Sequence, residues 1–236
     1  MRRTLLIFVK APRLGQVKRR LARDIGGVEA WRFYRRTARR LILRLARDPR
    51  WRCHLVVTPD SFDGRERFWP LACPVIKQGR GDLGRRMRRA LEAIPPGPAV
   101  LVGSDIPDLA PAHIAKAFDA LGHADAVFGP AEDGGYWLVG LSSRALRADP
   151  FAHVTWSSPN ALSDTVNNLP KGQSIAMLEP LSDIDVGADH ARWRLRERIE
   201  AASWRHANAT HSISISNSIG QDDMATNVRA GGSCGK

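Results

Sequence analysis

Short apolar runs alternate with amphipathic stretches along the first two hundred residues, and this alternation restricts the possible folds more than any other feature. The apolar runs end at Gly, Pro or Asp, which is typical of buried strands joined by crossover helices. The pattern predicts one Rossmann-like α/β domain, with a seven-stranded, mostly parallel sheet and helices on both faces. We expect the strands at Thr4–Val9, His54–Thr58, Pro74–Lys77, Ala99–Gly103, Ala126–Gly129, Trp137–Leu141 and Ser174–Leu178.

The amphipathic stretches predict helices between most of these strands. We expect them at Val17–Asp24, Val28–Arg47, Leu83–Ala93, Pro111–Leu121, Asn160–Leu169 and Ala188–Trp204. The strand at Trp137–Leu141 follows its predecessor too closely for a crossover helix, so we expect it to be the one antiparallel member of the sheet. We place the domain at residues 1–204, and the Ser- and Asn-rich residues 205–236 are predicted to form a disordered tail.

Charge is distributed unevenly along the chain, which carries 36 Lys and Arg against 24 Asp and Glu. Residues 1–94 hold 25 basic and 8 acidic side chains, whereas residues 95–187 hold 4 basic and 11 acidic ones. An enzyme that binds a phosphorylated ligand through a divalent metal needs both signs at one cleft. Seven arginines recur at helical spacing within Val28–Arg47, opposite an apolar stripe from Val28 to Leu45, which predicts a solvated helix face. The alternative to an enzyme is a protein that binds nucleic acid through this helix.

Several other classes of protein are disfavoured by composition and motifs. The three scattered cysteines suggest neither a disulfide framework nor a zinc site, and they favour a cytoplasmic protein. The apolar run at Leu5–Val9 is too short for a signal sequence or a membrane span, so we expect no membrane partner. The sequence contains no Gly-x-Ser-x-Gly, HExxH or Walker lysine motif, which disfavours hydrolase and P-loop readings.

Two glycine-containing segments follow predicted strands at the edge where open α/β sheets bind ligands. In the first, Lys10, Gly15, Lys18 and Arg20 surround the start of a helix, where free N–H groups and cations favour a phosphate. In the second, Gly79-Arg-Gly-Asp-Leu-Gly84, either the backbone approaches a ligand or Asp82 caps the next helix. We retain Asp82 as a candidate nucleotide-binding residue.

Acidic residues mark the remaining candidate segments. Asp105 ends an apolar strand just after Gly103, and Asp183 and Asp185 are spaced to point to one side of an extended stretch. Three carboxylates of this kind suit a hard divalent cation, Mg²⁺ or Mn²⁺, although Asp183 and Asp185 could instead cap the following helix.

Between these acids lies Gly129-Pro-Ala-Glu-Asp-Gly-Gly-Tyr-Trp137. Its two adjacent glycines, Gly134 and Gly135, open room for a ligand, and Asp133 could orient a hydroxyl or act as a base. Because Asp-Gly is also a strong turn signal, a plain hairpin is the alternative.

Taken together, "KAPRLGQVKRRL", "GSDIPDL", "GPAEDGGYWLVGL" and "SDIDVGADH" resemble a bacterial family of nucleotide-diphospho-sugar transferase-like proteins with the glycosyltransferase A fold, akin to the 2-phospho-lactate guanylyltransferases. The resemblance implies that Asp105, Asp183 and Asp185 bind the metal, and that Lys10, Lys18 and Arg20 contact the nucleotide. The chain departs from the family where Lys-Arg-Arg-Leu replaces Lys-Thr-Arg-Leu, and where Val-Gly rather than Thr-Pro follows Asp-x-Asp.

These features lead to one hypothesis and two alternatives. The chain is predicted to be a metal-dependent glycosyltransferase that moves a sugar from a nucleoside diphospho-sugar to a small-molecule acceptor, with Asp105 and Asp133 as catalytic residues. A nucleotidyltransferase that joins a nucleoside triphosphate to a small phosphorylated acceptor would use the same acids and lysines. A non-enzymatic nucleic-acid binder would work through the arginine-rich helix, and we favour the small-molecule enzyme over it.

Overall fold

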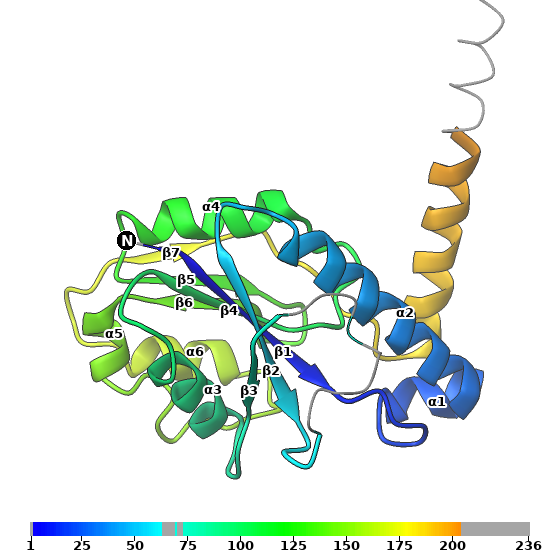
Figure 1. Cartoon of the computed structure of the whole chain (residues 1–236), viewed down its shortest axis with the longest axis horizontal. Helices are drawn as coiled ribbons and strands as arrows, with labels where there is room; N and C mark the ends of the chain where they lie inside the picture. The colour runs from blue at the N-terminus through cyan, green and yellow to red at the C-terminus, as the bar shows by residue number, and fades with distance from the viewer. Residues whose placement is uncertain (1, 63–68, 70–72, 204–236) are drawn as a thin grey trace, which may run out of the picture. The chain divides into compact units, whose positions relative to one another are not determined.

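The computed structural model describes residues 2–62, 69 and 73–203 of the chain. Its centre is a seven-stranded sheet in the order β3-β2-β1-β4-β6-β5-β7 (Figure 1). Every predicted strand is present, and the predicted α/β fold class is confirmed. The strands are β1 (Thr4–Lys10), β2 (Arg52–Thr58), β3 (Val75–Lys77), β4 (Ala99–Val102), β5 (Ala126–Pro130), β6 (Tyr136–Leu141) and β7 (Ile175–Met177).

The sheet is parallel except at β6, as predicted. β1 pairs in parallel with β2 and β4, and β5 pairs in parallel with β7. β6 runs antiparallel to both of its neighbours, β4 and β5. The reason is local, because only residues 131–135 join β5 to β6 and so short a connection permits a hairpin but no crossover.

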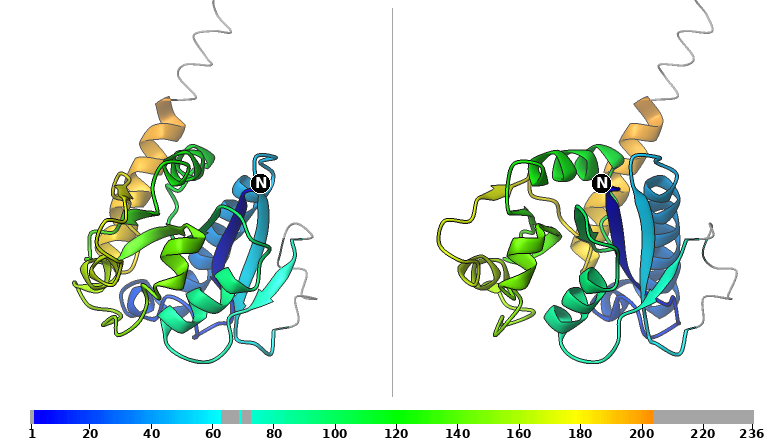
Figure 2. Two further views of the ribbon diagram at one scale, coloured as in Figure 1. Left: turned by 90° about the vertical axis from the view of Figure 1, so that its left-hand side faces the viewer. Right: turned by 60° about the vertical axis from the view of Figure 1, so that its left-hand side comes forward.

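Helices cover both faces of the sheet, as the alternation of side chains along β1 requires (Figures 1 and 2). Leu5, Ile7 and Val9 pack in one hydrophobic cluster with residues of α2 and α4, whereas Leu6 packs in a second cluster with residues of α3, α5 and α6. The helices are α1 (Arg19–Ile25), α2 (Gly27–Ala46), α3 (Leu83–Glu92), α4 (Pro111–Leu121), α5 (Ser143–Arg147) and α6 (Ala161–Asn167).

Helix α2 confirms the predicted solvated arginine face with one correction. Its six arginines and Arg47, the C-cap, are exposed, while Tyr34, Ala38, Leu41, Ile42 and Leu45 are buried against the sheet. Val28, expected in the apolar stripe, is 49% exposed because it lies in the first turn of the helix, before the stripe meets the sheet.

Contacts divide the chain into two units, Met1–Gly187 and Ala188–Lys236. Residues 187–203 are helical, in agreement with the helix predicted from Ala188. The predicted disordered tail at 205–236, and hence the boundary placed at residue 204, lies outside the described residues. Among the residues that are described, no helix combines the length and the apolar character needed to cross a membrane.

Candidate active site

Four segments meet at the carboxyl-terminal edge of the parallel strands. They are the loop after β1, the loop after β4, the β5–β6 hairpin at residues 131–135 and the extended chain after β7. The order of the strands reverses beside β1, where β2 lies on one side and β4 on the other. Open α/β sheets bind their ligands in the crevice at such a reversal.

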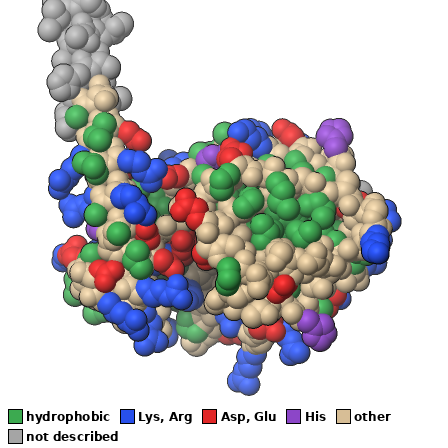
Figure 3. All heavy atoms as spheres, turned by 180° about the vertical axis from the view of Figure 1, so that it is seen from behind, with side chains coloured by type: hydrophobic (Ala, Val, Ile, Leu, Met, Phe, Trp, Pro, Cys, Tyr) green, Lys and Arg blue, Asp and Glu red, His purple; other side chains and the backbone are tan. Residues whose placement is uncertain are grey.

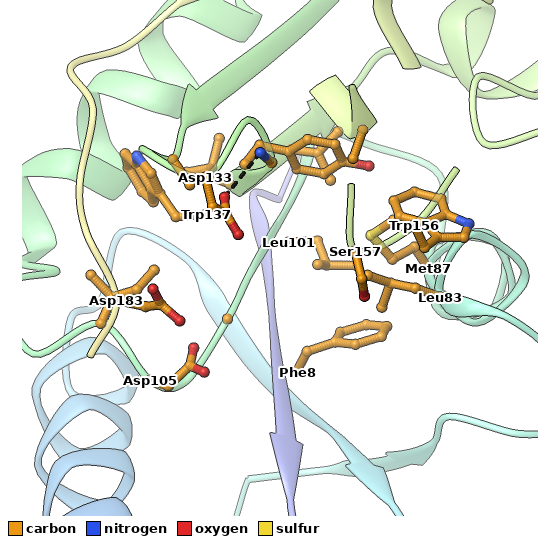
Figure 4. Close-up of a pocket in the computed structure, with 18 of the residues that line it drawn as sticks. Phe8, Leu83, Met87, Leu101, Asp105, Asp133, Trp137, Trp156, Ser157 and Asp183 are labelled. Carbon is orange, nitrogen blue, oxygen red and sulfur yellow. Dashed lines mark hydrogen bonds between the residues drawn. The ribbon is translucent and has the colours of Figure 1, made fainter. Parts of the chain in front are cut away.

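Three carboxylates converge at this edge. Asp105 follows β4, while Asp183 and Asp185 lie in the extended chain after β7. One oxygen from each residue lies within 4.8 Å of the others. Figure 4 shows the carboxylates of Asp105 and Asp183 turned toward each other at one end of a cavity. The predicted meeting of acids far apart in the sequence is therefore present in the fold.

Lys18 lies among the three carboxylates. Its Nζ is 3.0 Å from Asp105 Oδ2, 3.5 Å from Asp183 Oδ2 and 2.7 Å from Asp185 Oδ1, to which it donates a hydrogen bond. The side chain is only 5% exposed, and the backbone at this N-cap of α1 is left-handed, with φ 45°. A left-handed lysine costs about 1–2 kcal/mol, and such strain concentrates at functional sites.

The ionisation of these groups follows from their contacts. Burial alone lowers the pKa of Lys18, but the carboxylates of Asp105, Asp185 and Asp183 outweigh it, so the pKa is raised and the ammonium stays charged. Burial, together with the neighbouring Asp105 and Asp185, raises the pKa of Asp183 to about 6. Burial also acts to raise the pKa of Asp185, but its hydrogen bond and charge interaction with Lys18 lower it overall.

Tyr34 of α2 ties two of the segments together. Its hydroxyl accepts a hydrogen bond from the Lys10 backbone N–H at 2.9 Å, donates to the Lys10 carbonyl at 3.0 Å and lies 3.3 Å from Ser104 Oγ. Burial raises the pKa of Tyr34 to about 12, so the phenol stays protonated. The sequence placed Tyr34 in the apolar stripe of its helix and nothing more. A helical period predicts that the ring is buried, but it does not show whether the hydroxyl forms hydrogen bonds.

A basic cavity of about 610 Å³ opens beside the carboxylates. The end of β1, the loop into α1 and the start of α3 contribute its walls. Five cationic side chains line it, as do the three acids and the buried amide of Gln78. The cations are Lys10, Lys18, Arg19, Arg20 and Arg86.

A second, largely apolar cavity of about 260 Å³ adjoins the first. Phe8, Gly103, Asp105 and Asp183 are among the residues that line both cavities. Figure 4 shows Asp105, Asp133 and Asp183 toward one end of this cavity, and Phe8, Leu83, Met87 and Trp156 toward the other. No sequence signal pointed to Trp156, since it lies in irregular chain between α5 and α6.

The β5–β6 hairpin places Asp133 on the apolar cavity. The Asp133 carboxylate is exposed, and its Oδ1 accepts a hydrogen bond from the Gly135 N–H at 3.0 Å (Figure 4). Gly134 has φ 83°, and a Cβ there would overlap the backbone of Pro159. Both the predicted turn and the predicted proximity of Asp133 to a cavity are thus observed. Gly135 lines that cavity, whereas Gly134 packs against Pro159.

Comparison with known proteins identifies the family. Residues 41–158 match the family described as "Uncharacterized protein conserved in bacteria (DUF2064)". A crystal structure of a "putative nucleotide-diphospho-sugar transferase" from Desulfovibrio desulfuricans G20 is 32% identical, covers 79% of this chain and 84% of its own, and has a TM-score of 0.71. The chain belongs to the DUF2064 family. The expected resemblance to nucleotide-diphospho-sugar transferase-like proteins is confirmed. No curated protein matches the chain in sequence.

More distant structures show how widely this fold is shared. A nucleotidyl transferase from Methanothermobacter thermautotroptrophicus is 15% identical, with a TM-score of 0.57 over 83% of this chain and 97% of its own. A protein from Mycobacterium tuberculosis H37Rv, crystallised as a complex with manganese, is 17% identical, with a TM-score of 0.52 over 81% and 97%. At these identities the likeness establishes the fold of the DUF2064 protein and nothing finer.

The remaining predicted residues occupy different places in this DUF2064 structure. The Arg20 side chain is 72% exposed, and its Nη1 lies 3.6 Å from Asp185 Oδ2. Gly15 lies in the loop before α1 with φ 76°. Asp82 is the N-cap of α3 and accepts a hydrogen bond from the Arg85 N–H at 2.8 Å, which is the capping alternative raised for it. Neither Gly15 nor Asp82 is among the residues that line the two cavities.

The donor set of the three acids fits a hard divalent cation. Carboxylate oxygens are the ligands that Mg²⁺ and Mn²⁺ prefer, and three of them already surround one positive charge, the Lys18 ammonium. Their side chains are 38–41% exposed, so an ion from solvent can reach them. The cluster therefore has the chemistry and the access that a metal site requires.

Proposed function

We propose that this DUF2064 protein is a metal-dependent glycosyltransferase that uses a nucleoside diphospho-sugar. One observation carries the proposal, namely that three converging carboxylates adjoin a cavity lined by five cationic side chains. A diphosphate held through a divalent metal needs both kinds of charge at one place. The 32% identity to the D. desulfuricans structure, described as a "putative nucleotide-diphospho-sugar transferase", supports the same substrate class.

The basic cavity is assigned to the nucleotide. Lys10 and Arg20 would bind its phosphates through charge-assisted hydrogen bonds, with Arg86 adding positive charge at the start of α3. Asp105, Asp183 and Asp185 would hold Mg²⁺ or Mn²⁺, which when bound offsets the negative charge that grows on a diphosphate leaving group. Tyr34 is a positioning residue here, because it fixes the end of β1 against Ser104.

The apolar cavity is assigned to the acceptor, and Asp133 to its activation. The acceptor oxygen forms a bond to the anomeric carbon of the sugar, the bond from that carbon to the diphosphate breaks, and the nucleoside diphosphate leaves with the electron pair. Asp133 receives the hydroxyl proton of the acceptor as general base. Its Oδ1 accepts the Gly135 N–H, which orients the carboxylate and leaves Oδ2 for this proton.

Nucleotidyl transfer is the second candidate, and the fold likeness to the M. thermautotroptrophicus nucleotidyl transferase supports it. In that reaction a phosphorylated acceptor displaces pyrophosphate from a nucleoside triphosphate. The apolar cavity favours glycosyl transfer, since the described residues that line it include three aspartates and no Lys or Arg to receive an acceptor phosphate. Product analysis separates the two reactions, because the first releases a nucleoside diphosphate and the second releases pyrophosphate.

Thermal unfolding with Mn²⁺ and nucleotides tests the proposal, because a ligand of the folded state raises Tm. We expect Mn²⁺ together with one nucleoside diphosphate, or its sugar, to raise Tm more than either component alone. Asp105→Asn should abolish this joint increment, whereas Glu132→Gln, a change at an exposed acid outside the triad, should preserve it. A wild-type increment in the Asp105→Asn protein would contradict the proposal.

A further inference from the structure

The apolar cavity is small, and its size limits what it can hold. Its volume is about 260 Å³, below the range of roughly 300–1,000 Å³ usual for drug-sized ligands. An apolar cavity of about 150 Å³ is enough to bind benzene. The cavity therefore accommodates one ring, or an aliphatic group of similar size, with a short arm.

The apolar end of the cavity is built around Trp156. The Trp156 ring lies 6.4 Å from that of Tyr136 in an edge-to-face arrangement and 6.4 Å from that of Phe151. It also packs over Gly84 of α3, where a Cβ would come within 2.7 Å of Trp156 Cζ2. Met87, one turn further along α3, is 2% exposed and lines the same end. Any larger residue at position 84 would displace the indole, so the close packing holds this wall in place before a ligand arrives.

Charge at the other end restricts the ligand further. Asp105, Asp133 and Asp183 line the cavity, and no Lys or Arg is among the described residues of its lining. The Lys18 ammonium, in the adjoining basic cavity, offsets part of the charge of Asp105 and Asp183, but Asp133 is not one of its partners. A phosphate or carboxylate on the ligand would therefore face the Asp133 carboxylate with no cation on the described part of this wall. A hydroxyl, in contrast, can donate to Asp133 while the apolar body of the ligand lies between Phe8 and Trp156 (Figure 4).

We propose that the acceptor is a hydroxyl compound without an anionic group, whose apolar body of about one ring is held among Phe8, Met87 and Trp156 and whose hydroxyl faces Asp133. This inference rests on the proposed transferase function and names the class of its second substrate. Apolar contacts bind the body of the acceptor, and the carboxylates exclude anionic analogues.

Methionine methyl NMR tests this assignment on the full chain, without nucleotide or metal. Met87 lines the cavity, while Met177, 51% exposed on β7, is an internal control. The probes are 2-phenylethanol, its phosphate ester and glycerol. We expect 2-phenylethanol to shift the Met87 resonance saturably and leave that of Met177 unchanged, with the ester at least about tenfold weaker and glycerol inert. An unshifted Met87, or binding of the ester as tight as that of 2-phenylethanol, would overturn the proposal.

A positive charge added to the cavity wall tests whether the carboxylates exclude anionic ligands. The expected result is a gain of binding, which a loss of folding cannot produce. Leu83, 41% exposed, lines the cavity, and Leu83→Lys should strengthen binding of the phosphate ester about tenfold without a comparable effect on 2-phenylethanol. Val75→Lys, at a residue 40% exposed on edge strand β3, is the matched control and should alter neither. Unchanged ester binding in Leu83→Lys would contradict the role given to charge.

The two proposals fail separately. If Met87 does not respond but Mn²⁺ and a nucleotide stabilise the protein jointly, the acceptor class is wrong and the transferase proposal stands. If joint stabilisation is absent while 2-phenylethanol binds, the transferase proposal fails and the cavity is an apolar ligand site of another kind.

Discussion

The Lys18 ammonium offsets part of the negative charge of three acids, at the place where the proposed metal ion would do the same, and a substitution of Lys18 separates the effects of the two cations. Lys18→Met keeps most of the side chain but leaves Asp105, Asp183 and Asp185 to repel one another, so we expect Tm to fall in EDTA. Mn²⁺ no longer competes with an ammonium, so it should raise Tm more in the variant than in the wild type. Lys116→Met, at a 61% exposed lysine paired with Glu179, should show the wild-type increment. Equal increments in Lys18→Met and the wild type would rule out competition for the same oxygens.

Asp183 predicts a pH dependence of stability in the metal-free protein. Because its folded pKa of about 6 exceeds the ordinary 3.8, the folded state binds the proton more tightly than the unfolded state does. The resulting stabilisation is complete below about pH 3.8 and is lost as the pH rises through 6. Asp183→Asn stays neutral throughout, so its free energy of unfolding minus that of the wild type should be more positive at pH 7.5 than at pH 4.5. Urea denaturation in EDTA measures this, and a difference that does not vary with pH would refute it.

The Tyr34 hydroxyl should contribute more to stability than another buried phenol. Tyr34→Phe leaves the Lys10 peptide without its partner and Ser104 without its neighbour, a loss of about 1–3 kcal/mol. Tyr136→Phe removes only a 3.4 Å contact with Thr165, whose hydroxyl already donates to the Ala161 carbonyl. Urea denaturation of both variants gives the comparison. A loss in Tyr136→Phe as large as that in Tyr34→Phe would mean that the bonds to Lys10 add no stability.

At the scale of elements, the β5–β6 hairpin depends on Gly134 for two separable reasons. Alanine at Gly134 or at Gly172 must adopt a φ near +85°, which costs about 1–2 kcal/mol. Only at Gly134 would the new methyl also overlap the Pro159 backbone, since no atom lies within 4 Å at Gly172. We therefore expect Gly134→Ala to lose more stability than Gly172→Ala in denaturant titrations, and to reduce any activity that depends on Asp133. Equal losses would show that Pro159 moves aside freely.

The elements that sequence predicts best are those with a strong periodic signal. β1 and β4 are continuous apolar runs, as strands covered on both faces must be, and α4 begins at Pro111, as the helix-start signal indicated. α5 escaped prediction because five residues are too few to show a helical period. The order of strands also follows partly from sequence, since the short β5–β6 connection permits only a hairpin.

The candidate site was predictable in its acids and less so in its basic and aromatic parts. Asp105, Asp183 and Asp185 follow strands, so parallel topology alone brings them to one edge. Lys18 is buried with its backbone in the left-handed conformation, and a lysine in the sequence does not predict that conformation. Trp156 lies at the cavity through its packing on Tyr136, Phe151 and Gly84, and the last is a contact between residues 72 positions apart with no periodic pattern to indicate it.

At the scale of the whole molecule, the reversal of charge along the sequence becomes a boundary within the sheet. The basic residues 1–94 supply β3, β2 and β1, and the acidic residues 95–187 supply β4, β6, β5 and β7. The pairing of β1 with β4 joins the two halves, and Lys18 and Asp105 follow these two strands. Basic and acidic side chains accordingly lie next to one another on the face seen in Figure 3. The site thus places a basic wall beside a cluster of acids, which are the two kinds of charge that the proposed transferase reaction requires.

This arrangement predicts that salt affects the two proposed ligands differently. Salt screens exposed charges, with a Debye length that falls from about 10 Å at 0.1 M to about 3 Å at 1 M, whereas burial of apolar surface is not weakened in this way. Between 0.05 and 0.5 M KCl we expect the Kd of a nucleoside diphosphate to rise several-fold, and the Kd of 2-phenylethanol to change little. Calorimetry and the Met87 resonance measure the two affinities on the same protein. A parallel loss of both affinities would mean that the two cavities do not divide the substrates by charge.

Adjacent arginines on α3 show whether this salt effect arises at the cavity itself. Arg86 lines the basic cavity and donates to the Gly81 carbonyl, while the neighbouring Arg85 is 78% exposed and is not among the residues of the cavity wall. Arg86→Gln should weaken nucleotide binding about tenfold, the loss of one charge-assisted contact, and should flatten its salt dependence. Arg85→Gln changes the net charge equally, so an effect of the same size there would assign the salt dependence to the overall basic charge of the chain instead of to the cavity.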